Sequence, residues 1–562
     1  MKAYQNYLLL LLIGIINPIF AQADMPVSST NVENKTVEVN ALRVKDIEPI
    51  RRNYPKREIV ASTKYFDVKI KSTGASVTSF LHKDDENPLR REVELVDKNP
   101  FDFVIYQTAA SLNKLRKQSY KLSKVDQGNF VIIKATTDIN AITDAGKKPL
   151  RLTKVFKFHK EMHYWEFYWE VKNLSRSHIS FENLYFLPLN KIGPAPEATA
   201  SYASRGFNTF YFMKDDFETK ANIEGGGSSP FSGWFGSNDQ ETEYIEGKVD
   251  YFGMSSRFMI LAVQPLTASR GLYEFPVEVQ AHLGRLVVKA NDTASHKFLL
   301  YAGPKVKDFM SVSPEDKQKY PEVKNVHEDL YKAFDFGFTE PIRELIVVIL
   351  KFFYTFIPNY GVGIILFALF FKLIFFPLNQ AQAKSMKKMQ ALQPKLKVIN
   401  EKYKDNPQEK QKQTIQLYKK HKANPLGGCL PMIIQIPIFI ALYSAFSNAY
   451  ELWGAPFITG WIDDLSKPDT IYTIAESIPV VGGINLNPLP VIMVASQFLQ
   501  MKLTTVSGDS NQQKMMMFLP FIMLFFFWNM PSGVVLYWIV FNVFSVLQQV
   551  LTKTDIGKTQ NA

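Results

Sequence analysis

Apolar residues are unevenly distributed along the chain. Long apolar runs are concentrated after residue 340, whereas the preceding residues mix polar and apolar positions over short intervals. A run of about 20 predominantly apolar residues has the length needed to cross a bilayer as a helix. The pattern therefore predicts a membrane part in the second half of the chain and a globular part before it.

The globular part shows the two-residue period of β-strands. The period is clearest in YWEFYWEVK, where Trp165, Phe167 and Trp169 alternate with charged or polar residues. Because successive strand side chains point to opposite faces, the segment predicts one buried and one polar face. Similar segments recur between turn-forming clusters such as EGGGSSP, so we predict an all-β sandwich domain over residues 56–330.

The N-terminus has the features of an export signal. A lysine precedes a short apolar run, and the sequence AQA at residues 21–23 has small residues at the positions typical of signal cleavage. We predict a signal or anchor segment over residues 1–23, either cleaved or retained, and in both cases an exported domain after it. Residues 24–55 are polar and poor in aromatic side chains, which predicts a linker.

Six apolar segments follow the predicted sandwich, and the first differs from the others. Residues 340–358 carry Arg343, Glu344 and Lys351 among apolar residues, which favours an amphipathic helix lying in the membrane surface. The other segments predict a multi-pass α-helical membrane protein with a five-helix core over residues 359–552. Its predicted spans are about 359–378, 427–449, 488–503, 514–529 and 533–552, and residues 553–562 form a short tail.

The charges of the connecting loops predict the orientation of the core. The loop after the first span carries twelve lysines against three acidic residues, whereas residues 450–487 carry five acidic residues against Lys467. Lysine and arginine are enriched in cytoplasmic loops of membrane proteins. We therefore expect residues 379–425 and the C-terminus in the cytoplasm and residues 24–340 outside it, in agreement with the export signal.

The lysine-rich loop also has internal order. Apolar residues recur near helical spacing from Met386 to Ile399, an Asn-Pro pair interrupts them, and the spacing resumes with Ile415 and Tyr418. This predicts a helical hairpin over residues 379–425. A solvated charge run is the alternative interpretation.

One charge lies inside the first predicted span. Lys372 stands in the run GVGIILFALFFKLIFFPL, and a lysine at the centre of a membrane helix costs roughly 2.5 to 3.5 kcal/mol on insertion scales. Its long side chain can extend toward the headgroups near Leu378. A functional, water-exposed charge lining a wet cavity is the second interpretation, and the residue pattern alone leaves both open.

Composition narrows the classes of function. The single cysteine, Cys429, excludes an internal disulfide framework and a multi-cysteine metal site. The net charge of +12 would suggest nucleic-acid binding on a soluble domain, but here lysines gather in a predicted membrane loop. The sequence contains no catalytic or nucleotide-binding motif, so we expect neither an enzyme nor a cofactor.

Four long motifs resemble the YidC/Oxa1/Alb3 membrane insertase family. They are FFPLNQAQAKSMKKMQALQPK (375–395), NPLGGCLPMIIQIPIFIALY (424–443), LTTVSGDSNQQKMM (503–516) and MPSGVVLYWIVFNVFSVLQQ (530–549). Together they cover the predicted membrane half in family order. In the predicted sandwich, SGWFG and YAGPK are similar to the large periplasmic domain of Gram-negative members.

The resemblance implies an energy-independent insertase and chaperone for inner-membrane proteins, acting alone or with the Sec translocon. It also implies a hydrophilic groove in the core with a positive charge on the first core helix, where Lys372 replaces the arginine of many members. Ala368 replaces a hydroxyl residue of some relatives. The implied groove residues are Lys372, Tyr537, Trp538, Gln435 and Gln500, the two glutamines having helix–helix hydrogen bonding as the alternative role.

The resemblance further implies partners and a place in the cell. The partners are nascent membrane proteins, the Sec translocon, the ribosome, the signal-recognition-particle receptor and the lipid bilayer, without direct nucleic-acid specificity. The place is the inner membrane, with residues 24–340 in the periplasm. The implied cytoplasmic docking surface is the lysine-rich hairpin, with Lys384, Lys387, Lys388, Lys395, Lys419 and Lys420.

Two other functions remain open at the level of the sequence. A small-solute transporter or channel also uses a lone buried charge and broken helices, although we find no inverted repeat and no second charge to couple an ion. A membrane-anchored carbohydrate-processing or binding protein is the other, because the family's sandwich resembles sugar mutarotases. No set of carboxylates and histidines supports that catalysis.

Overall fold

The computed structural model describes a β domain (residues 41–319) and a helical core (residues 340–559), each with gaps. The described residues are 41–50, 52, 54–83, 92–96, 100–187, 192, 208–213, 216–221, 243–266, 271–275, 278–310, 312, 314–319, 330, 340–377, 380, 391–392, 394–396, 398–404, 406–421, 430–474, 485–504 and 510–559. The predicted signal segment, residues 24–40 of the predicted linker, and Lys384, Lys387 and Lys388 lie outside them.

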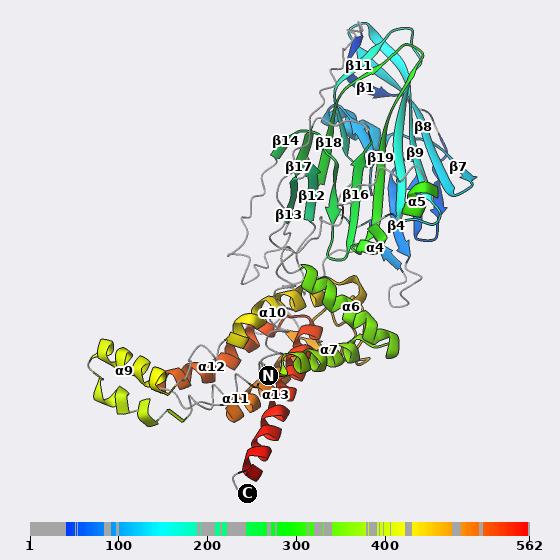
Figure 1. The fold of residues 1–562 in the computed structure, drawn as a ribbon. Helices are drawn as coiled ribbons and strands as arrows, with labels where there is room; N and C mark the ends of the chain where they lie inside the picture. Colours follow the sequence, from blue (N-terminus) through cyan, green and yellow to red (C-terminus); the bar gives the residue numbers. More distant parts are fainter. Residues whose placement is uncertain are drawn as a thin grey trace. The chain divides into compact units, whose positions relative to one another are not determined.

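The β domain consists almost entirely of strands, which confirms the predicted β class (Figure 1). Its strands are β1 (Leu42–Pro49), β2 (Glu58–Ser62), β3 (Phe66–Lys71), β4 (Val77–Lys83), β5 (Glu92–Glu94), β6 (Val104–Tyr106), β7 (Lys121–Gln127), β8 (Phe130–Thr143), β9 (Gly146–His159), β10 (Tyr164–Asn173), β11 (Ile179–Leu187), β12 (Asn208–Met213), β13 (Asp216–Ala221), β14 (Glu243–Glu246), β15 (Tyr251–Ser255), β16 (Met259–Pro265), β17 (Gly271–Phe275), β18 (Glu278–Val288) and β19 (Thr293–Pro304). The helices beside them are α2 (Ala109–Lys117), α4 (Lys307–Met310) and α5 (Pro314–Lys319).

Most of these strands belong to one continuous sheet. Its order is β13-β12-β15-β16-β19-β10-β9-β8-β1-β11-β18-β17-β14, with β6 beside β11 and β7 beside β8, while β2 to β5 form a separate four-stranded sheet. The large sheet folds back on itself into two layers. This arrangement is seen in the aromatic rings of β11, which face those of β10 and β19 across the core. Phe186 stacks on Phe298 at 4.1 Å and on Phe167 at 5.6 Å between ring centroids.

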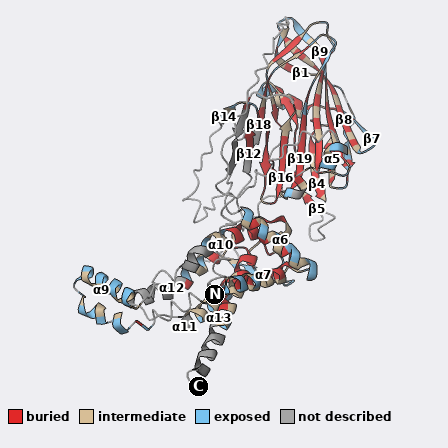
Figure 2. Cartoon of the chain, in the orientation of Figure 1, coloured by how far each residue is buried: buried red, intermediate tan, exposed pale blue. Residues whose placement is uncertain are grey.

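Strand β10 shows the alternation found in the sequence. Trp165, Phe167 and Trp169 are all buried, and the ring of each belongs to the main core of the domain. On the other face, Glu166 pairs with Lys157 of β9 at 2.7 Å. The buried face appears in Figure 2 as the red positions along the strands, and its burial is the main stabilisation of the domain.

The predicted linker is wrong for residues 42–49, which form β1. This strand joins the two layers, since Leu42 and Arg43 pair with β11 while Val44 to Pro49 pair with β8. The register shifts between Val44 and Asp46, so the buried Val44 and Ile47 stand three residues apart instead of two. A bulge of this kind breaks the alternation that identifies a strand in the sequence.

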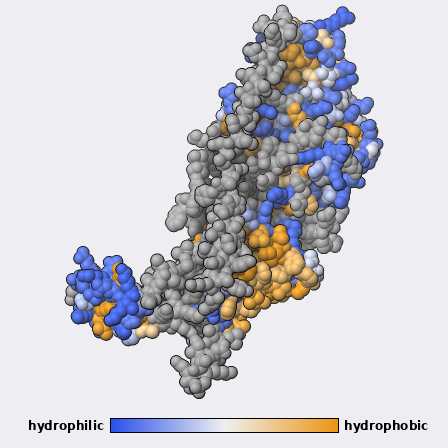
Figure 3. All heavy atoms as spheres, viewed as in Figure 1, coloured by the Kyte–Doolittle hydropathy of each residue, from blue (hydrophilic) through white to orange (hydrophobic). Residues whose placement is uncertain are grey.

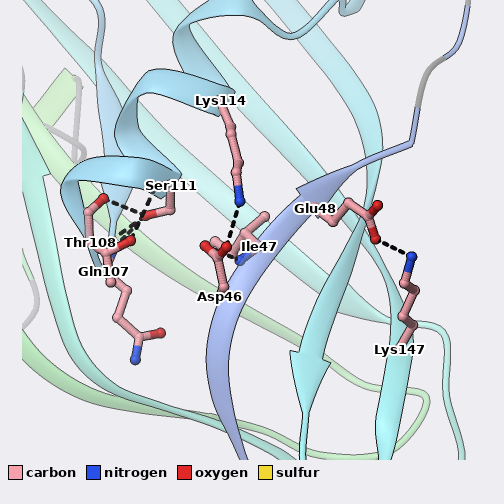
Figure 4. Close-up of polar contacts among 8 residues, drawn as sticks. All are labelled: Asp46, Ile47, Glu48, Gln107, Thr108, Ser111, Lys114 and Lys147. Carbon is pink, nitrogen blue, oxygen red and sulfur yellow. Dashed lines mark hydrogen bonds and ion pairs between the residues drawn. The ribbon is translucent and has the colours of Figure 1, made fainter.

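Polar contacts fasten β1 to its neighbours (Figure 4). Asp46 forms an ion pair with Lys114 of α2, and Glu48 forms one with Lys147 of β9. Helix α2 begins with a capping box, in which Thr108 and Ser111 each accept a hydrogen bond from the other's backbone amide. The cap satisfies two amide groups that a helix start leaves open.

One lysine lies in the interior of the β domain. Lys154 of β9 is 1% exposed, and its ammonium donates to the carbonyl oxygens of Gly74 and Asp102 at 2.7 Å each. Ala75 and Phe103, which follow these carbonyls, have φ angles of 44° and 45°, a region that costs energy for side-chain-bearing residues. Burial lowers the pKa of Lys154 to about 7, and the Asp102 carboxylate opposes that shift. The lysine thus holds two strained turns together.

The helices after residue 340 occupy the predicted amphipathic segment, the five predicted spans and the predicted hairpin. They are α6 (Glu340–Phe356), α7 (Tyr360–Ile374), α9 (Pro407–Lys420), α10 (Leu430–Asn448), η6 (Tyr450–Leu452), α11 (Pro488–Thr504), α12 (Ser510–Phe527) and α13 (Ser532–Thr559), with the short strands β20 (Tyr472–Thr473) and β21 (Asn485–Leu486) between them. Helix α13 continues through residues 553–559, which corrects the predicted boundary between the last span and its tail.

A helix that crosses a membrane alone must be both long and apolar. No single described helix is both long and apolar enough. Helices α6 and α7 meet the requirement only as a pair, and they are bent by 118° at the break between them. The break separates the predicted amphipathic segment from the predicted first span.

The lysine-rich loop contains two helical segments where it is described. One includes residues 398–402, and the other is α9, which begins at the Asn-Pro pair with Asn406 as its N-cap. Lys395 Nζ and His421 Nε2 are 3.0 Å apart, so the far ends of the two segments meet. Lys395, Lys419 and Lys420 are exposed.

Two buried histidines connect the small and large sheets of the β domain. His82 of β4 stacks on His163, which precedes β10, with ring centroids 5.3 Å apart. His82 is 1% exposed, and neither of its ring nitrogens has a partner among the described residues. Burial lowers the pKa of His82 to about 4 and also lowers that of His163, to which His82 and Lys64 contribute.

We predict that His82→Phe makes the β domain less sensitive to acid. The unfolded chain takes up a proton near pH 6.5 and the folded chain near pH 4, so wild-type stability is full above 6.5 and falls as the pH decreases toward 4. At pH 5 the loss due to His82 is about 2 kcal/mol, and phenylalanine fits the same aromatic cluster without titrating. Thermal unfolding of the full chain in detergent, followed from pH 7.5 to pH 5, measures this. Equal acid sensitivity in both proteins would contradict it.

Candidate functional site

The candidate site lies where α7 packs beside α13. Helix α7 begins at Asn359, whose side chain accepts a hydrogen bond from Val362 N at 3.1 Å. Its buried face includes Ile364, Ala368 and Lys372, which are spaced four residues apart and therefore lie in one row. The lysine is thus on the face that α7 turns toward its neighbours.

Helices α7 and α13 run parallel to each other. Near their starts, a Cβ at Gly533 would lie 3.2 Å from Ile364 Cδ1, so the helices approach closely there. Further along, Phe367 contacts Tyr537 with ring centroids 6.1 Å apart. Because residue numbers rise together on both sides, these contacts form one continuous contact line, which we call the α7–α13 seam.

Lys372 lies at the far end of the seam and is enclosed by α13. Its Nζ donates to Ser545 Oγ at 2.7 Å and lies 4.2 Å from the ring centroid of Phe541. Lys372 is 8% exposed and Ser545 is 5% exposed. The sequence left extension toward the headgroups and exposure to a wet cavity open for this lysine. In the structure, α13 supplies both a hydroxyl and an aromatic face to its ammonium.

The two aromatic groove candidates point to different neighbours. Tyr537 is 1% exposed and lies in the seam against Phe367, and its hydroxyl has no partner among the described residues. Trp538 instead contacts Phe439 of α10 at 5.4 Å and Phe527 of α12 at 5.3 Å between ring centroids. Adjacent residues on a helix face different directions, so the structure brings only Tyr537 to the seam that holds Lys372.

Among the described residues, the structure shows no hydrogen bond between the remaining groove candidates and the Lys372 ammonium. Ala368 is fully buried, and Gln500 is partly buried on α11. Gln435 belongs to α10, but its side chain lies outside the described residues.

The sequence did not single out Ser545, and α13 carries a second polar residue, Asn542, one turn earlier. Asn542 donates to Ser496 Oγ of α11 at 3.0 Å, so α13 has a polar contact on two sides. The available signal for Ser545 was its position eight residues after Tyr537, on the same helix face.

The loop between α10 and α11 binds the starts of two core helices. Asp469 is 3% exposed, and its Oδ2 accepts from Leu489 N at 2.7 Å and from Trp461 Nε1 at 3.3 Å. Nearby, Ser532 N donates to Lys467 O at 2.7 Å. The loop therefore satisfies amide groups at the starts of both α11 and α13.

Helices α6 and α7 expose large apolar side chains, visible in Figure 3 as the orange area over these helices. The α6 residues lie on the side opposite the buried Ile346 and Leu350. Exposed apolar faces of this kind suit contact with lipid. Among them are Leu345, Val348, Phe352, Phe356, Phe370 and Leu373.

The family models and the curated relatives described below agree on one family. Residues 352–559 match the family model described as 60Kd inner membrane protein, and residues 58–349 match the model of the YidC periplasmic domain. The membrane protein insertase YidC of Leptospira interrogans serovar Lai is 36% identical over 550 residues, which cover 90% of this chain and 86% of that protein. The chain belongs to the YidC membrane insertase family.

Other members of the YidC family are similar over comparable lengths. The YidC of Syntrophobacter fumaroxidans is 31% identical over 507 residues, 86% of this chain and 84% of that protein. A crystal structure of an active YidC insertase with its first transmembrane domain resolved matches 91% of this chain and 94% of that chain, with 19% identity and a TM-score of 0.35. The family is one of membrane insertases and is not an enzyme family.

We predict that Asp469→Ala destabilises the helical core, whereas Asp469→Asn does not. Alanine leaves the buried donors of Leu489 and Trp461 without an acceptor, a loss of about 1–3 kcal/mol, while asparagine retains a side-chain oxygen. Thermal unfolding of the full chain in detergent, followed by helical circular dichroism, compares the two variants. Equal stability of the alanine and asparagine variants would contradict the proposed role of the acceptor.

The stability of the wild type and that of Asp469→Asn should also depend differently on pH. Burial raises the pKa of Asp469 to about 6, against the opposing hydrogen bonds from Leu489 and Trp461. A raised carboxyl pKa means that the folded state holds the proton more firmly, so the wild type loses stability as the pH rises from about 4 through 6. Asp469→Asn carries no titrating group and should lack this decrease.

Proposed function

We propose that this protein inserts hydrophobic segments of other inner-membrane proteins and assists their folding, with the seam around Lys372 as the point of engagement. The family assignment over 90% of the chain carries the insertase function. The observation that supports Lys372 as the working charge is its setting. It is a buried ammonium whose partners, among the described residues, are a neutral hydroxyl and a neutral ring.

This setting favours an acidic substrate. A charge taken out of water without an opposite charge is unfavourable, so a carboxylate that reaches Lys372 gains an ion pair in a medium of low dielectric constant. A substrate segment with an acidic extracytoplasmic tail would meet this requirement. The ion pair lowers the cost of moving the tail through the apolar region.

The apolar part of the substrate would enter the lipid directly. Helices α6 and α7 already expose large apolar side chains, so lipid and substrate can both lie against this surface. The free energy gained by burying an apolar segment, about 25 cal/mol per Å², drives insertion without a nucleotide. The step therefore needs a charge and an apolar surface, and both lie on α7.

The family assignment supports an inner-membrane location, and the loop charges support the orientation that we propose. The family is one of the inner membrane and has a periplasmic domain. We propose that the β domain is that domain, that α6 lies in the membrane surface, and that residues 379–425 and the C-terminus are cytoplasmic. The 118° bend between α6 and α7 supports a helix in the surface followed by a helix that enters the membrane.

The lysine-rich hairpin is our candidate for docking the ribosome, the signal-recognition-particle receptor and the Sec translocon. Its described part exposes Lys395, Lys419 and Lys420 together with two apolar side chains, Val398 and Ile415. A cationic surface attracts ribosomal RNA and acidic proteins over long distances.

The family assignment supports the insertase function over that of a small-solute transporter.

We predict that Lys372→Ala and Lys372→Glu reduce insertion of a single-span substrate with an acidic tail, whereas Lys372→Arg retains it. Arginine keeps the positive charge, alanine removes it, and glutamate repels the tail. The loss is about tenfold, the change in rate that 1.4 kcal/mol produces. The measurement is the yield of protease-protected substrate in reconstituted vesicles, normalised to the amount of folded insertase. Normal insertion by Lys372→Ala would show that the ammonium serves only the packing of α7.

We also predict that reversing the hairpin charge weakens association with ribosomes that carry a nascent membrane protein. Lys395, Lys419 and Lys420 changed together to Glu should reduce co-sedimentation roughly tenfold at low salt, because long-range attraction becomes repulsion. The matched control changes three exposed lysines of the β domain, Lys121, Lys124 and Lys172, to Glu. It makes the same change in net charge, so equal losses in both variants would reject specific docking through the hairpin.

A further inference from the structure

The hydroxyl of Ser545 is oriented to accept a hydrogen bond from Lys372. Ser545 Oγ donates to the carbonyl oxygen of Phe541, one turn earlier in α13, at 2.7 Å. A hydroxyl has one proton to donate and two lone pairs that accept. Since the proton is used within α13, the oxygen presents a lone pair to the ammonium of Lys372, 2.7 Å away.

The pair formed by Lys372 and Ser545 leaves the positive charge without a counter-charge. Among the described residues, no carboxylate lies within ion-pair distance of Lys372, whose remaining close contact is the ring of Phe541. Hydrogen bonds in which both partners are charged are stronger than those to a neutral acceptor. An incoming carboxylate can therefore take the place of the hydroxyl with a net gain.

The rest of the seam keeps α7 in place when this exchange occurs. At the other end, the close approach of Gly533 to Ile364 fixes the distance between the helices by packing alone. On the side of α13 toward α11, Asn542 and Ser496 form a separate hydrogen bond that does not involve Lys372. Loss of the bond between Lys372 and Ser545 would thus free the ammonium while the helices remain packed.

We propose that Ser545 is a positioning residue that holds the Lys372 ammonium against α13 in the resting core and gives it up to a carboxylate of the incoming segment. This proposal rests on the proposed insertase function and adds to it the residue that accepts the hydrogen bond of Lys372 before substrate arrives. The preferred substrate then has an acidic residue in its translocated tail, because an anion is a stronger acceptor for the ammonium than the Ser545 hydroxyl.

The first test measures how accessible the ammonium of Lys372 is in the resting protein. Full-length protein in membrane vesicles is treated with a water-soluble amine-acylating reagent, and modification of Lys372 is quantified by peptide mass spectrometry relative to exposed Lys395. Ser545→Ala should raise the modification rate of Lys372 about tenfold, as expected if the lost bond contributes about 1.4 kcal/mol to the closed state. Ser545→Thr keeps the hydroxyl and should react like the wild type.

The matched control is Ser496→Ala, which removes a hydroxyl of the same core that bonds Asn542. It should leave the reactivity of Lys372 unchanged, because Ser496 has no contact with the lysine. If Ser545→Ala leaves Lys372 as unreactive as in the wild type, or if Ser496→Ala raises its reactivity equally, the positioning role is overturned.

The second test gives Lys372 a permanent counter-charge. Ser545→Asp supplies a carboxylate in the place of the hydroxyl and should lower insertion of a substrate with an acidic tail about tenfold, because the substrate now competes with a charged partner. Insertion of the same substrate with its acidic residues changed to Asn or Gln should not fall. Equal losses for both substrates would indicate a structural defect and overturn the proposal.

These experiments separate the positioning role from the proposed function. If Lys372→Ala abolishes insertion while Ser545→Ala and Ser545→Asp behave like the wild type, Lys372 works without Ser545 and only the inference fails. If Lys372→Ala inserts acidic-tailed substrate normally, the role of the charge in the proposed function fails, whatever the reactivity of Lys372 in Ser545→Ala.

Discussion

A positive charge inside an apolar helix bundle is the constraint on which the rest of the helical core depends. Lys372 has only neutral partners within the described residues, a hydroxyl and an aromatic ring, so the charge is stabilised less than it would be in an ion pair. The fold tolerates this because packing elsewhere holds α7 and α13 together, from Gly533 to Tyr537. In the function that we propose, the same setting leaves the ammonium able to bind an anion, while the packing of the seam offsets the unfavourable burial of the charge.

The β domain handles a buried cation in the opposite way. Lys154 is buried even more fully than Lys372. Its ammonium donates to two backbone carbonyl oxygens at 2.7 Å, and its charge lies near Asp102. A site with that many acceptors has little to gain from an additional ligand. Burial is therefore common to both lysines, and the number and kind of their partners differ. This difference is why we propose a substrate role for Lys372 and not for Lys154.

The sequence predicted the features that follow from periodicity and from regional charge. The alternation in β10, the apolar segments that became α7 and α10 to α13, and the Asn-Pro break before α9 are local patterns, so they could be found without knowing the fold. Strand β1 was missed because a bulge places Val44 and Ile47 out of alternation. Ser545 was missed because its importance depends on Lys372, 173 positions earlier, and its spacing from Tyr537 does not by itself identify that partner.

Helix α13 connects the candidate site with the loop between α10 and α11 through a series of contacts. Its start is bound by backbone groups of residues 465 and 467, its middle meets Phe367 of α7 and Ser496 of α11, and its later turns hold Ser545 against Lys372. The Asp469 carboxylate fixes the start of α11 through the same loop. In our proposal, a substrate that separates Lys372 from Ser545 would act on a helix that stays bound at its start and loses one contact near its later turns. Such an arrangement permits local rearrangement at the charge without unfolding the core.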